Sequence, residues 1–161
     1  MSSPSRPRPD WGPGTLVVLV GPPAAGKSTW AATYPATWTV CLDAYRALCA
    51  DTEADQSATT EAVRLQDVIV DARLARGLVT IVDSTATDAH VRRALIARAH
   101  YWRRPVAAVL FTTSLDECLV RNSSRPRQVP EAVIRWKHGQ VPSSDELRDE
   151  GFDSVTTWNA A

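Results

Sequence analysis

The segment GPPAAGKS, residues 21–28, constrains the fold of this 161-residue chain more than any other feature. It follows the apolar run TLVVLV and precedes STWAATY, whose composition suits a helix. The segment fits the pattern G-x-x-x-x-G-K-[ST], in which backbone N–H groups wrap phosphates, the lysine reaches the β- and γ-phosphates and the hydroxyl binds magnesium. A Gly/Pro turn is the alternative, but four matched positions between a strand and a helix favour a nucleotide loop.

Composition limits the architecture to one globular domain. Hydrophobic residues make up 44% of the chain and charged residues 22%, which is ordinary globular usage. The proline-rich residues 1–14 are predicted to be a flexible tail, and residues 15–161 the folded domain. A net charge of zero excludes a broad nucleic-acid-coating surface, so any contact with a polynucleotide is expected to be local.

The cysteines and apolar runs predict a cytoplasmic protein with no membrane contact. Cys41, Cys49 and Cys118 have no paired metal or disulfide spacing, and scattered thiols are typical of a reduced compartment. No disulfide partner is therefore expected. Every apolar run is far shorter than the roughly 20 residues that a membrane span needs.

Short apolar runs alternate with helical patterns, which predicts an α/β fold with a parallel sheet covered by helices on both faces. The predicted strands are 15–20, 37–42, 78–82, 106–111 and 154–157. The predicted helices are 57–76, 91–101 after a cap at Thr87 or Asp88, two that begin with capping boxes at Ser114 and Ser143, and one with Pro130 in its first turn. The polar segment 121–130 is predicted to be a mobile loop.

Acidic residues follow two of the predicted strands, at the sheet edge where ligands bind in open parallel sheets. Asp83 ends LVTIVD, the pattern of an acid that reaches magnesium, although it could instead cap a helix. Asp43 ends TVCLD, with Arg46 three residues further on. Asp43 could accept the proton of an attacking hydroxyl while Arg46 holds an acceptor phosphate, or the two could form only a surface ion pair.

The loop at 121–130 carries Arg121, Arg125 and Arg127. If it closes over a nucleotide, one or two of these arginines would neutralise charge on the transferring group and exclude water. Because 18 basic residues include only Lys27 and Lys137 as lysines, arginines are frequent in this chain and a solvated face is the alternative.

Several segments together resemble the kinase domain of bacterial polynucleotide kinase-phosphatases and, more distantly, phage polynucleotide 5′-kinase. They are GPPAAGKST, DAYR, DTEADQSAT, ARLARGLVTIVDST, CLVRN and EGF, and they extend from about residue 15 to 152. The resemblance implies a single three-layer P-loop kinase domain of the ATP-binding AAA type, with strand order 2-3-1-4-5. It further implies ATP and Mg2+ as cofactors and a short nucleic acid with a 5′-hydroxyl end as substrate.

The resemblance also implies residue roles. Asp43 would be the general base, Lys27, Arg121 and Arg125 would act on the ATP phosphates, and Ser28 and Asp83 would bind the metal. Arg46, Arg73, Asp83 and Thr85 would line the acceptor side. ATP would be bound by Gly21, Pro22, Pro23, Ala24, Ala25, Gly26, Lys27, Ser28 and Thr29.

The chain differs from this family at two points. Ala86 replaces the asparagine of D-x-T-N, and Arg125 and Arg127 are spaced differently from the usual R-x-x-R. Two other functions therefore stay open. The first is a kinase acting on a small-molecule hydroxyl of a nucleoside, sugar or antibiotic, and the second is an ATP-binding switch or regulatory ATPase without an acceptor.

Overall fold

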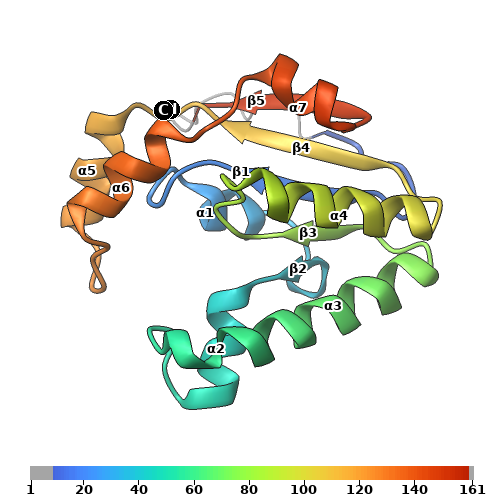
Figure 1. Cartoon of the computed structure of the whole chain (residues 1–161), viewed down its shortest axis with the longest axis horizontal. Coiled ribbons are helices and arrows are strands. Elements are labelled where there is room, and N and C mark those ends of the chain that lie inside the picture. The colour runs from blue at the N-terminus through green and yellow to red at the C-terminus, as the bar shows by residue number, and fades with distance from the viewer. Residues whose placement is uncertain (1–8, 160–161) are drawn as a thin grey trace, which may run out of the picture.

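The computed structural model describes residues 9–159, which form a five-stranded parallel sheet between two layers of helices (Figure 1). The strand order is β2-β3-β1-β4-β5, which confirms the predicted fold class. The strands are β1 (Leu16–Val20), β2 (Thr39–Val40), β3 (Thr80–Val82), β4 (Val106–Phe111) and β5 (Ser154–Trp158). The helices are α1 (Lys27–Ala31), α2 (Leu42–Ala50), α3 (Thr59–Ala75), α4 (Ala89–Tyr101), α5 (Leu115–Ser123), α6 (Glu131–Gly139) and α7 (Ser144–Glu150), with short 3-10 helices η1 (Ala36–Trp38) and η2 (Gln56–Ala58).

The central strand β1 is buried on both faces, because helices cover the sheet on each side. Leu16, Val18 and Val20 pack with residues of α3, α4 and α7. Val17 and Leu19 alternate with them and pack with residues of α1, α5 and α6. In Figure 1, α4 crosses in front of the strands and α1 lies behind them. Because all strand pairs are parallel, the carboxyl ends of the five strands lie at one edge of the sheet.

Local capping signals place several helices where the sequence predicts them. Ser114 and Ser143 each accept a hydrogen bond from the backbone N–H three residues on, and both predicted capping boxes are complete. The side chain of Asp88 caps α4 by accepting from the N–H of His90. These caps satisfy N–H groups that have no partner within the helix.

Strand β2 is shorter than predicted. After Pro35 the chain forms η1, so that the predicted strand residues Thr37 and Trp38 belong to a 3-10 turn. Leu42 already begins α2. Asp43 therefore lies in the first turn of a helix and not at the end of a strand.

The segment 121–130 also differs from its prediction, because α5 continues through Ser123 and the loop after it is anchored. The side-chain amide of Asn122 donates to the carbonyl of Val129 at 2.9 Å, and its oxygen accepts from the N–H of Val129 at 2.9 Å. Asn122 is buried, so the two bonds hold the ends of the loop together.

The amino-terminal segment is described only from residue 9, and residues 1–8 of the predicted tail lie outside the described residues. Trp11 is half-buried against the core on the α1 side of the sheet. Within residues 9–159, no helix combines the length and the apolar character that crossing a bilayer requires. All three cysteines in this range are free thiols.

Candidate active site

The loop between β1 and α1 has the backbone that its glycines predict. Gly26 has a φ of 99°, which side-chain-bearing residues rarely adopt. At Gly21 a Cβ atom would lie 2.8 Å from the Cβ of Phe111, so a side chain here would force its neighbours to shift. The loop is thus shaped by two glycines for two different physical reasons.

Lys27 is buried and folds back over its own loop. Its Nζ donates to the carbonyl oxygens of Gly21 at 2.9 Å and Pro22 at 2.6 Å. Burial lowers the pKa of Lys27 to about 8, and the negative charge of Asp83 opposes this only in part. A phosphate oxygen would be a stronger, charge-assisted acceptor than either carbonyl, so the amine is placed to exchange partners.

Ser28 and Asp83 meet directly, although 55 positions separate them in the chain. The Ser28 hydroxyl donates to Oδ2 of Asp83 at 2.7 Å. Burial raises the pKa of Asp83, while the hydrogen bond from Ser28 and the charge of Lys27 act against the rise. Two adjacent oxygen ligands suit Mg2+, which keeps several waters and binds nucleotide phosphates. Residues 9–159 contain no cluster of three or more His, Cys, Asp or Glu side chains that would form an all-protein metal cage.

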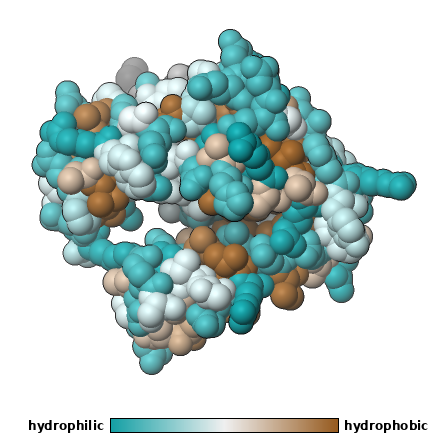
Figure 2. Space-filling model, in the orientation of Figure 1, coloured by the Kyte–Doolittle hydropathy of each residue, from teal (hydrophilic) through white to brown (hydrophobic). Residues whose placement is uncertain are grey.

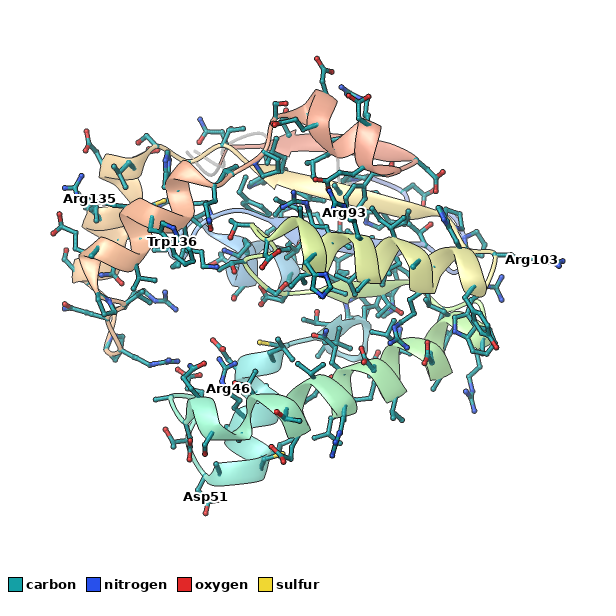
Figure 3. All side chains as sticks on the ribbon, in the orientation of Figure 1. Arg46, Asp51, Arg93, Arg103, Arg135 and Trp136 are labelled. Carbon is teal, nitrogen blue, oxygen red and sulfur yellow. The ribbon has the colours of Figure 1, made fainter. Side chains whose placement is uncertain are left out.

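The opposite side of the site is formed by α2. Arg46 is 8% exposed and donates from Nη2 to Oδ1 of Asp43, one helical turn earlier. Its Nε donates to the backbone carbonyl of Glu53 at 2.9 Å, which fixes the guanidinium. The Asp43 side chain remains 51% exposed. The arginine is therefore held rigidly, while the carboxylate stays open to solvent. Figure 3 labels Arg46 on this side, across from the helices α5 and α6.

The segment formed by α5, the loop 124–130 and α6 borders the site from the other direction, and we call it the lid. Nη1 of Arg121 approaches the carbonyl of Ala25 at 3.4 Å, close to the nucleotide loop. Arg125 lies near enough to Lys27 for its charge to contribute to the lowered pKa of that lysine. Nη1 of Arg127 instead donates to Oε1 of Glu53 at 2.9 Å.

These elements enclose one cavity of about 1120 Å3. Figure 2 shows it as an opening between the lid and the α2 side of the molecule. The predicted residues that line it are Pro23, Ala24, Ala25, Gly26, Lys27, Ser28, Thr29, Asp43, Arg46, Asp83, Thr85, Arg121 and Arg125. The structure thus brings both halves of the predicted site to one space.

Three predicted residues do not line the cavity. Gly21 and Pro22 lie behind it, where their carbonyls accept from Lys27. Arg73 donates to the carbonyl of Val79 at 2.6 Å and to the hydroxyl of Thr80 at 3.2 Å, which ties α3 to the start of β3. The acceptor-side role predicted for Arg73 therefore has no support in this geometry.

Several residues at the site escaped the sequence prediction. The hydroxyl of Thr113 donates to the carbonyl of Ala25 at 2.9 Å and so braces the nucleotide loop. Because Thr113 closely follows β4, the same search of strand ends that found Asp83 would have found it. Ser84 lines the cavity without a sequence signal of its own.

Comparison with known proteins places the chain in a family. The profile described as AAA domain matches residues 16–141. No curated protein matches the chain in a sequence search.

Solved structures with a similar fold differ in what they are named for. One comes from the Pnkp1/Rnl/Hen1 RNA repair complex, with a TM-score of 0.70 and 18% identity over 92% of this chain and 49% of that chain. Kti12 from Chaetomium thermophilum in complex with ADP-AlF3 has a TM-score of 0.60 and 13% identity, over 90% of this chain and 89% of that one. A gluconokinase from Sinorhizobium meliloti has a TM-score of 0.55 and 15% identity, over 92% and 83%.

The TM-scores show a shared P-loop kinase-like fold, and these structures do not determine the acceptor. The chain spans about half the length of the RNA repair protein that it matches.

Proposed function

The chain belongs to the AAA domain family, and we propose that it is an ATP- and magnesium-dependent kinase that phosphorylates the 5′-hydroxyl group of a nucleic acid. The observation that carries this proposal is the position of Asp43 and Arg46, which face the nucleotide loop across a single cavity. A half-exposed carboxylate beside a fixed guanidinium suits an acceptor that presents both a hydroxyl and a phosphate.

In the proposed reaction, Asp43 accepts the proton of the 5′-hydroxyl as its oxygen attacks the γ-phosphorus. The bond from that phosphorus to the β–γ bridging oxygen breaks, and ADP leaves with the bridging oxygen. Lys27 exchanges its carbonyl partners for phosphate oxygens, and Arg121 and Arg125 neutralise the charge that develops there. Mg2+ bound through Ser28 and Asp83 would supply charge neutralisation at the phosphates.

A nucleic acid is favoured as acceptor by the sequence resemblance and by the similar fold of the RNA repair protein. The acceptor side offers Arg46 as a fixed phosphate contact, and a nucleic acid end always carries a phosphate near its 5′-hydroxyl. Zero net charge is compatible with such a substrate if only its end enters the cavity.

A small-molecule hydroxyl is the second candidate acceptor. Ala86 stands where the resembling family has a polar asparagine, and the gluconokinase shares the fold. A kinase of this kind would use the same donor side and the same base, but it would not depend on Arg46 as a phosphate contact.

An acceptor screen tests the proposal. The protein is incubated with labelled ATP, Mg2+ and, in separate reactions, 5′-hydroxyl DNA and RNA oligonucleotides, nucleosides and sugars, and both ADP release and acceptor labelling are measured. Labelling of an oligonucleotide that falls strongly in Arg46→Ala supports the proposal. Labelling of a small molecule alone, insensitive to Arg46→Ala, favours the second candidate. ADP release without any labelled acceptor would refute both.

A further inference from the structure

Three of the lid arginines, Arg121, Arg125 and Arg127, divide between the two sides of the cavity. Arg121 contacts the nucleotide loop, and the charge of Arg125 acts on Lys27. Arg127 points to the other side, where its Nη1 donates to Oε1 of Glu53 at 2.9 Å and lies 4.0 Å from Oδ2 of Asp43. The lid therefore reaches the acceptor side through Arg127.

Two guanidinium groups consequently flank one carboxylate. Arg46 contacts Oδ1 of Asp43, whereas Arg127 approaches Oδ2. Arg46 is fixed from behind by the Glu53 carbonyl, and Arg127 is held from the side by the Glu53 carboxylate. Locally, two positive charges are balanced by two negative ones, so a phosphate can pair with one of these guanidinium groups only if a carboxylate gives up its contact to it.

The Arg127–Glu53 pair is the contact that can yield. Its side chains are 43% and 50% exposed, and exposed ion pairs contribute about 0–1 kcal/mol. Hydrogen bonds from a guanidinium to a phosphate are charge-assisted and often bidentate, so they compete well with such a pair. Asp43, by contrast, keeps its contact to the buried Arg46.

We propose that Arg127 is a specificity-determining residue of the acceptor site, where it and Arg46 hold a phosphate of the acceptor in competition with Glu53. The lid then closes on the acceptor as well as on ATP, and acceptors that carry a phosphate near the attacking hydroxyl are selected. This inference rests on the proposed kinase function for its role in turnover, but the binding itself can be measured without turnover.

The test compares the binding of adenosine 3′-monophosphate and of adenosine by titration calorimetry. Both ligands are added to protein saturated with Mg2+ and a non-hydrolysable ATP analogue, so that the donor side is filled. The variants are Arg127→Ala, Glu53→Gln and, as matched control, Arg135→Ala. Arg135 is an exposed arginine of the lid helix α6 that also pairs with a carboxylate, Glu131.

Arg127→Ala is expected to weaken adenosine 3′-monophosphate binding by at least about tenfold, as for a lost charge-assisted contact. Binding of the ATP analogue should change less than about twofold, and Arg135→Ala should behave like the unaltered protein. Glu53→Gln should tighten adenosine 3′-monophosphate binding by about two- to fivefold, the range of an exposed ion pair.

Either of two results would overturn the proposal: Arg127→Ala weakens the ATP analogue and not the 3′-monophosphate, or adenosine and its 3′-monophosphate bind equally well to the unaltered protein. If the phosphate preference holds but no acceptor is ever phosphorylated, the proposed kinase function fails and the assignment of Arg127 stands.

Discussion

Raising the pH from 7 to 9 should weaken ATP binding by about tenfold, because the buried Lys27 loses its proton in this range. Lys27 is 8% exposed and has a pKa of about 8. Phosphates placed against the amine favour its charged form and raise its pKa in the complex. Below pH 8 the amine is already charged and affinity should be flat. Above pH 8 binding must bring a proton with it, so affinity falls by up to about tenfold for each pH unit.

The same pKa fixes the number of protons taken up. The free protein has lost this proton in about one-tenth of molecules at pH 7, half at pH 8 and nine-tenths at pH 9. Binding should therefore take up about 0.1, 0.5 and 0.9 protons at these three pH values. Titration calorimetry with a non-hydrolysable ATP analogue and Mg2+, in buffers of different ionisation enthalpy, measures this number directly.

Lys27→Met supplies the control, since it keeps an apolar stem at this position and cannot titrate. Its binding should be weaker at every pH, and it should take up no protons above pH 8. Equal ATP affinity of the unaltered protein at pH 7 and 9, or the same proton uptake in Lys27→Met, would contradict this role of Lys27.

Three predictions concern stability. The free energy of unfolding should rise between pH 8 and 10.5 by up to about 3 kcal/mol relative to Lys27→Met, because in this window the unfolded chain binds the proton that folded Lys27 has lost. Urea unfolding at several pH values measures this free energy, and the same pH dependence in both proteins would contradict the prediction. Glu150→Gln should lower the free energy of unfolding by about 3 kcal/mol in the same assay, because buried Arg92 loses the carboxylate that it contacts at 2.6 and 2.7 Å. A decrease below about 1 kcal/mol would contradict this prediction. Gly21→Ala should destabilise by about 1–3 kcal/mol because its Cβ meets Phe111, and an unchanged melting temperature would show that the loop adapts.

The sheet and the donor side could be predicted because their signals are local. β1, β3 and β4 are apolar runs, and the loop after β1 carries its glycines, lysine and serine within eight positions. Asp83 could be predicted to meet Ser28 because both follow strands that end at the same edge of the sheet. The strand order agreed with the order implied by the family resemblance.

What could not be predicted depends on tertiary contacts. The run TWTVCL reads as a buried strand, but Trp38 stacks on Tyr34 with ring centroids 5.8 Å apart and the strand keeps only two residues. Arg73 donates to the carbonyl of Val79, and no signal in the sequence indicates this contact. The pairing of Arg127 with Glu53 joins positions 74 residues apart, and the sequence offered Arg127 only as a nucleotide contact or a solvated side chain.

In the proposed reaction, Asp43 is the base of a phosphoryl transfer to a 5′-hydroxyl group. The most direct test measures the single-turnover rate of transfer from ATP to a 5′-hydroxyl oligonucleotide by the unaltered protein and by Asp43→Asn, together with the Kd of each for ATP. The substitution is expected to lower the transfer rate by about 100-fold or more and to change the Kd by less than about twofold. A rate that survives in Asp43→Asn, or no transfer to any oligonucleotide by the unaltered protein, would contradict it.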